Sequence, residues 1–182
     1  MSTRNLYGGL VTATIPLNVI DLNDDPSWVQ EVPDSQEVFR YDRSNAIIVI
    51  EVLQKVAPQD GDDPVRVVFD SLAPAGAAGT VDNPPEIQIQ RKDSILLTGT
   101  QYIAKNDRRP DELDQVRIAL CLFDTVDQHN DLAVSFTVPI SYHGSRGEET
   151  ERITWDQAKK DFIDLVTSLT IKPGLFKAPS DS

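Results

Sequence analysis

The 182-residue chain is poor in cysteine and histidine and lacks long apolar runs. Its single cysteine, Cys121, excludes an internal disulfide and favours a reducing compartment. The N-terminal stretch MSTRNLYGGLVTATIP lacks the apolar segment of a secretory signal, and no apolar run approaches the length of a membrane span. These absences predict a soluble protein of the cytoplasm or nucleus.

Basic residues are also scarce, because 17 of them stand against 29 acidic residues and leave a formal charge of −12. Such a field repels nucleic-acid phosphates and anionic membrane surfaces, and it attracts a basic protein partner. The alternative is that the acidic surface only keeps the protein soluble. The charge therefore predicts neither a nucleic acid nor a membrane as partner, and it leaves the protein partner open.

The sequence carries no recognisable catalytic motif. It contains neither a G-x-x-x-x-G-K-[ST] phosphate loop nor a G-x-S-x-G turn. His129 and His143 lie in separate expected loops without further metal ligands nearby, and Cys121 alternates with apolar neighbours, which favours a buried thiol. The chain is therefore expected to be a binding protein and not an enzyme, with no catalytic residue, metal or cofactor.

Hydrophobic periodicity predicts three strands and a short helix in the first half of the chain. The strands span residues 10–15, 36–41 and 46–53, and the last is apolar enough to be covered on both faces. Residues 19–30 are expected to form an acidic turn region. Asp63 and Pro64 favour the start of a helix, and residues 73–86 should follow it as a flexible linker.

The second half is expected to add three strands and a longer helix. The strands span residues 93–105, 116–123 and 132–140, and the last two should form a hairpin. The helix should begin after Thr154, with Gln157 completing a capping box, and Pro173 should end it. The pattern predicts an α/β (α+β) fold with about six mainly antiparallel strands in one domain over residues 1–182, with a tail at 177–182.

Four stretches of this sequence, together with the expected C-terminal helix and the GLF that follows it (residues 174–176), resemble the Mog1 family of Ran-binding proteins. Their order is kept, and the match covers nearly the whole chain. Gln54 departs from the family pattern, which usually has a second acid there, and the segment before VPD is longer than expected. The stretches are LYGG (residues 6–9), VPDSQEVF (32–39), IIVIEVLQ (47–54) and TGTQYIAK (98–105), which resemble L-[FY]-G-G, VPD-x-QEV-[FY], IIV-[DE]-LL-E and SGKQQIAK.

The resemblance implies a Mog1/PsbP-like fold, in which helices cover both faces of a six-stranded antiparallel sheet. It also implies binding to the GTPase Ran, release of its guanine nucleotide and support of nuclear protein import. The expected localisation is the nucleus with a cytoplasmic pool. A monomer is expected, because no apolar stripe is left over once the core is filled.

Six residues are expected to contact Ran on this basis. Asp34, Glu37 and Glu51 would form an acidic face that meets basic residues, with Asp34 held rigidly after Pro33. Other roles stay open, since Asp34 could only cap a turn and Gln36 could only satisfy buried backbone groups. A passive scaffold that binds a basic partner without altering its nucleotide state is the alternative function. The expected contact residues are Asp34, Gln36, Glu37, Glu51, Gln54 and Lys105.

Overall fold

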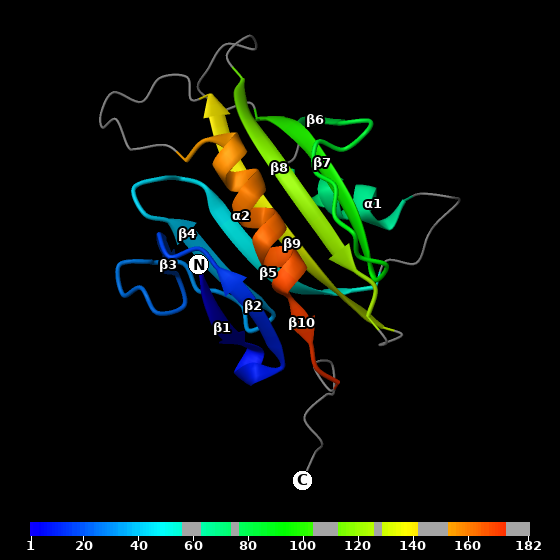
Figure 1. Cartoon of the computed structure of the whole chain (residues 1–182). Coiled ribbons are helices and arrows are strands. Elements are labelled where there is room, and N and C mark those ends of the chain that lie inside the picture. The colour runs from blue at the N-terminus through cyan, green and yellow to red at the C-terminus, as the bar shows by residue number, and fades with distance from the viewer. Residues whose placement is uncertain (56–62, 74–76, 104–112, 126–128, 142–152, 174–182) are drawn as a thin grey trace.

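Two antiparallel β-sheets of unequal size and two α-helices form the described part of the chain (Figure 1). The computed structural model describes residues 1–55, 63–73, 77–103, 113–125, 129–141 and 153–173. The small sheet has the order β1-β2-β10 and the large sheet the order β3-β4-β5-β9-β8-β7-β6. The elements are β1 (Ser2–Leu6), a 3-10 turn (Tyr7–Gly9), β2 (Val11–Ile15), β3 (Val19–Asp21), β4 (Gln36–Tyr41), β5 (Ile47–Gln54), α1 (Pro64–Ser71), β6 (Ala78–Val81), β7 (Ser94–Ile103), β8 (Asp114–Phe123), β9 (Asn130–Ser141), α2 (Trp155–Ser168) and β10 (Thr170–Ile171).

The main predicted elements are confirmed, but the large sheet has seven strands instead of about six. β4 spans the predicted residues, and the hairpin of β8 and β9 forms as expected. β3 occupies the start of the predicted turn region, and β6 lies inside the predicted linker. These strands are three and four residues long, so each is defined by its pairing with a longer neighbour and not by a pattern of its own.

Alternate residues of β8 enter two separate hydrophobic clusters. Ala119 and Cys121 belong to the cluster that includes α2, whereas Ile118 and Leu120 belong to the cluster that includes α1. Successive side chains of a strand point to opposite faces. The large sheet therefore has a core on each side of β8.

The larger cluster joins α2 and the small sheet to one face of the large sheet. α2 contacts β9, β8 and β2, and in Figure 1 it crosses in front of the large sheet. Phe162 of α2 meets Phe136 of β9 edge to face, with ring centroids 5.2 Å apart. β2 contributes its alternate residues Val11, Ala13 and Ile15 to the same cluster. Full burial of a valine, isoleucine or phenylalanine side chain contributes about 1.5–3 kcal/mol.

Side chains satisfy backbone groups at both ends of α2. The Thr154 hydroxyl accepts a hydrogen bond from the Gln157 amide at 3.2 Å, as a capping residue does, but the Gln157 side chain bonds Asp161 and does not complete the predicted box. At the other end, the Arg91 guanidinium donates to the Leu169 carbonyl at 2.7 Å. The helix ends at Ser168, five residues before the predicted stop, because the chain then turns into β10 and pairs with β2.

α1 packs on β7 and β8 through a glycine and a buried amide of β7. Asp63 caps this helix as predicted, since its carboxylate accepts a hydrogen bond from the Val65 amide at 3.2 Å. Phe69 lies fully buried over Gly99, and Gln101 donates its side-chain amide to the Phe69 carbonyl at 2.8 Å. On the face of the large sheet opposite α2, the helix α1 contacts mainly β7 and β8. The expected cover of both faces by helices therefore stays a prediction where β4 and β5 are concerned. We expected β5 to be buried on both faces, but its alternate residues Ile47, Val49, Glu51 and Leu53 are only half-buried.

We predict that the Gly99→Ala variant unfolds at lower denaturant concentration than the wild type. A Cβ at Gly99 would lie 2.6 Å from the Thr80 carbonyl oxygen and 2.8 Å from the Phe69 ring. Because a backbone atom cannot move away cheaply, the free energy of unfolding should fall by about 2 kcal/mol. Urea unfolding followed by circular dichroism measures this loss.

The matched control is Gly79→Ala on the edge strand β6. The nearest atom to its Cβ would be Phe69 Cε1 at 3.0 Å, which is a side-chain atom. We expect it to lose less than half as much stability as Gly99→Ala. An unchanged unfolding midpoint for Gly99→Ala would contradict the close packing of α1 on β7.

Candidate functional site

Two of the predicted residues, Gln36 at the start of β4 and Glu51 on β5, lie next to each other. They are paired across β4 and β5, and the Gln36 side-chain amide donates to a Glu51 carboxylate oxygen at 2.6 Å. Both side chains are half-buried. They point away from α2, because the neighbouring residue Ile50 belongs to the cluster beneath α2. We call these two residues the Gln36–Glu51 pair.

Asp34 is exposed in the tight turn that leads into this pair. The Gln36 amide donates to the Pro33 carbonyl at 2.8 Å, which closes a turn with Asp34 and Ser35 at its two central positions. Pro33 is therefore the first residue of the turn, and its ring fixes one backbone dihedral angle there. Asp34 is exposed and lies two residues before Gln36 in the sequence.

Glu37 does not share a face with Glu51. It pairs with Ile50 across the two strands, so its side chain points to the side of the sheet that carries α2 and the small sheet. There one carboxylate oxygen accepts a hydrogen bond from the Tyr7 backbone amide at 2.8 Å, and the other accepts one from the Asn23 side chain at 3.1 Å. The expected acidic face of Asp34, Glu37 and Glu51 is thus not a single surface.

Of the remaining two predicted residues, Gln54 is not brought to the Gln36–Glu51 pair. Gln54 is three residues after Glu51 on β5, so its exposed side chain points to the opposite face of the sheet. Lys105 lies outside the described residues. Of the six predicted contact residues, the described structure joins Gln36 to Glu51, and Asp34 lies in the turn that leads into this pair.

Tyr7 is the neighbour of this group that sequence reasoning missed. Its hydroxyl lies 2.6 Å from the Ile50 carbonyl oxygen and 2.9 Å from that of Ser35. Burial, with a smaller contribution from the nearby carboxylates of Glu37 and Glu51, raises the pKa of the Tyr7 phenol well above its usual range. Its position immediately before Gly-Gly was the available signal, but the sequence cannot reveal what the ring contacts.

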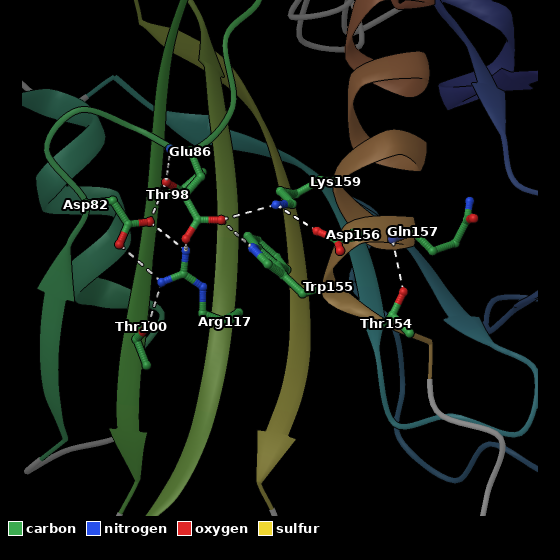
Figure 2. A network of polar contacts seen from close by, with 10 residues as sticks. All are labelled: Asp82, Glu86, Thr98, Thr100, Arg117, Thr154, Trp155, Asp156, Gln157 and Lys159. Carbon is green, nitrogen blue, oxygen red and sulfur yellow. Dashed lines mark hydrogen bonds and ion pairs between the residues drawn. The ribbon is translucent and has the colours of Figure 1, made fainter.

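A second polar assembly joins β8 to the N-terminal end of α2 (Figure 2). The Arg117 guanidinium donates to Asp82 at 2.6 Å and to Glu86 at 2.7 Å, and it stacks over Trp155 with 4.9 Å to the ring centroid. Glu86 also accepts hydrogen bonds from the Trp155 indole at 2.8 Å and from Lys159 at 3.3 Å. The assembly ties the segment after β6 to α2, and each of its charges has an oppositely charged neighbour.

The hydrogen bonds of this assembly lower the pKa of both of its carboxyl groups. Burial acts to raise the pKa of Asp82, but hydrogen bonds from Arg117 and Thr98 outweigh it. The Trp155 indole has the largest effect on Glu86, and Arg117 and Lys159 also lower the pKa of this group. Because these acids stay charged and paired, we assign the assembly a structural role.

The described residues offer little for covalent or metal chemistry. Within these ranges no group of three or more histidine, cysteine, aspartate or glutamate side chains could hold a metal ion. Burial raises the pKa of the Cys121 thiol to about 12, so it is a poor nucleophile at neutral pH. No helix of the described chain is long and apolar enough to cross a membrane.

Comparison with known proteins gives the class and then the family. The fold is that of an α/β protein in which two antiparallel sheets pack with two helices. The sequence model of the Ran-interacting Mog1 proteins matches residues 4–139, and the chain belongs to this family.

Several named relatives align over most of their length. The Ran guanine nucleotide release factor of Danio rerio is 26% identical over 183 residues, covering 93% of this chain and 96% of that protein. The human Ran guanine nucleotide release factor is also 26% identical, with 94% of each chain covered. The nuclear import protein mog1 of Schizosaccharomyces pombe is 25% identical, covering 81% of this chain and 82% of that protein.

Solved structures confirm the fold. The crystal structure of the Saccharomyces cerevisiae Ran-binding protein Mog1p superposes with a TM-score of 0.67 at 20% sequence identity, covering 97% of this chain and 98% of that one. The Mog1-type α/β fold with antiparallel sheets is therefore the fold of this chain.

We predict that Arg117→Met destabilises the protein at neutral pH and much less in acid. Because the pKa values of Asp82 and Glu86 are lowered in the folded protein, both carboxylates stabilise it at any pH above their ordinary pKa values of 3.8 and 4.5. This stabilisation is lost as the pH falls below those ordinary values and through the lower pKa values of the folded state. We expect a loss of about 2 kcal/mol at neutral pH. Urea unfolding at about pH 7 and about pH 3.5 should show the difference shrinking.

Arg43→Met is the control, because Arg43 is three-quarters exposed and its carboxylate neighbour Asp42 is 4.0 Å away. Such a surface pair contributes less than about 1 kcal/mol. An equal loss for Arg117→Met at both pH values would show that its charged contacts do not stabilise the fold.

Proposed function

We propose that this protein binds the GTPase Ran and promotes release of its guanine nucleotide, in support of nuclear protein import. The observation that supports this most strongly is the nearly full-length similarity to proteins named Ran guanine nucleotide release factor. The relatives named nuclear import proteins point to the same process. The protein acts as a regulator of a GTPase and is not itself an enzyme.

The surface that we propose for Ran is formed by Asp34 and the Gln36–Glu51 pair. Gln36 and Glu51 lie on the face of the large sheet that is turned away from α2, and Asp34 is exposed in the turn that leads into β4. Val49 and Leu53 share that face with Glu51 and are half-buried, so an apolar strip continues beside the carboxylate. Such a surface combines a charge that orients a basic partner with apolar area that gains free energy when it is covered.

Nucleotide release follows from thermodynamic linkage. A protein that binds nucleotide-free Ran more tightly than loaded Ran weakens nucleotide binding by the same factor. Each tenfold weakening requires about 1.4 kcal/mol of differential affinity. We propose that the Glu51 carboxylate supplies part of it by attracting the lysine of the phosphate loop, or by competing with the phosphates for Mg²⁺.

The net charge of −12 favours encounter with a basic surface of the partner. We propose that the protein works as a monomer, without nucleic acid or membrane as partner. Its place of action is the nucleus, with a cytoplasmic pool.

We predict that Glu51→Gln slows release of fluorescent GDP from Ran at least tenfold relative to the wild-type protein, because the amide keeps the size of the side chain but removes its charge. A tenfold change corresponds to about 1.4 kcal/mol. Release is followed by the fall in fluorescence in excess unlabelled nucleotide and Mg²⁺. Urea unfolding of the variant should match the wild type.

The control is Asp42→Asn, which removes one exposed carboxylate at the far end of β4 and changes the net charge equally. It should release nucleotide at the wild-type rate. If Glu51→Gln also keeps that rate, Glu51 is not part of the releasing surface. Binding of Ran with unchanged nucleotide release by the wild type would instead identify a passive scaffold.

A further inference from the structure

One side chain connects three stretches that are far apart in the sequence. The Tyr7 ring comes from the LYGG stretch, and its hydroxyl reaches the Ser35 carbonyl in VPDSQEVF and the Ile50 carbonyl in IIVIEVLQ. Ser35 and Ile50 immediately precede Gln36 and Glu51. The phenol therefore binds the backbone next to both members of the Gln36–Glu51 pair.

Tyr7 is itself held in a fixed backbone conformation. Tyr7, Gly8 and Gly9 have successive φ angles of 49°, 64° and 88°, in the left-handed region that a tyrosine seldom adopts. A residue keeps such a conformation only where its surroundings determine it. Here the Glu37 carboxylate does so, because it accepts the Tyr7 amide hydrogen at 2.8 Å and is held in turn by Asn23.

The Ser35 carbonyl also links β4 to β5 directly. It accepts the Val52 amide at 2.9 Å in addition to the Tyr7 hydroxyl. The two strands meet here at the first residue pair of β4, where the ladder ends and backbone positions are least restrained. A donor from a third segment at this point restrains the end of the ladder.

We propose that Tyr7 is a positioning residue that holds the Gln36–Glu51 pair in the geometry in which it meets its partner. Its effect on nucleotide release rests on the function proposed above. The phenol does not touch the partner, and it acts through the carbonyl groups of Ser35 and Ile50. Holding the pair before binding reduces the conformational entropy that binding would otherwise cost. Glu37 contributes to the same positioning, because its carboxylate holds the Tyr7 backbone amide. This role accounts for the direction of the Glu37 side chain, which points away from Glu51.

Tyr7→Phe tests the proposal, because it removes only the hydroxyl, and the resembling family opening admits phenylalanine at this position. By hydrogen exchange in NMR, the Val52 amide should exchange about fivefold faster, as expected for the loss of one hydrogen bond. Cross-peaks between the Gln36 side-chain amide and Glu51 should weaken. Release of GDP from Ran should slow about fivefold.

A double-mutant cycle separates positioning from a general effect on stability. If Tyr7 acts through Glu51, then Tyr7→Phe slows release in the wild-type background and has no further effect in Glu51→Gln. Equal slowing in both backgrounds would overturn the proposal. The control Tyr102→Phe removes a hydroxyl on β7, three strands from β5, and should leave release and Val52 exchange unchanged.

The exchange measurement needs no partner, so it separates the two proposals. If the wild type does not accelerate release, the proposed function fails, and faster Val52 exchange with weaker Gln36–Glu51 cross-peaks in Tyr7→Phe would still support positioning of the pair. Unchanged exchange and cross-peaks in that variant would overturn the role of Tyr7, whatever the protein does to Ran.

Discussion

The two-residue period of the strands is the constraint on which the rest of the structure depends. It divides β8 between two hydrophobic clusters, so that Cys121 packs under α2 and Leu120 packs under α1. The same period decides which polar residues can act together. Gln36 faces Glu51 across β4 and β5, whereas the next residue, Glu37, turns to the opposite side.

Residues within the stretches that resemble the Mog1 family therefore have different structural roles. Gly99 leaves room for the Phe69 ring, and Gln101 satisfies a carbonyl at the end of α1. Glu37 orders the turn at Tyr7, and only Gln36 and Glu51 of that part of the sheet form an open polar pair. A residue singled out by resemblance can serve either the fold or the partner, and its face and its hydrogen bonds indicate which.

The sequence predicted the elements that carry a strong period of their own. The helix stripe from Ala158 to Leu165 and the alternation from Leu132 to Val138 are long enough to define α2 and β9. β1, β3, β6 and β10 have two to five residues and owe their conformation to pairing, which no local pattern records.

For the candidate site, the sequence predicted Gln36 and Glu51, but the hydrogen bond between them depends on the strand register and was not predictable. The Tyr7 contacts join residues 28 and 43 positions apart, so they could not be inferred from spacing.

The small sheet also sets an order on folding. Its middle strand, β2, pairs with β1 from the beginning of the chain and with β10 at residues 170–171. During synthesis the residues of β1 and β2 are made long before those of β10 and of α2, against which the apolar residues of β2 pack. Closing so long a loop costs entropy that only the completed contacts repay. β1 and β2 are thus made before the elements that cover them, and until those elements are in place the two strands need protection from association with other chains.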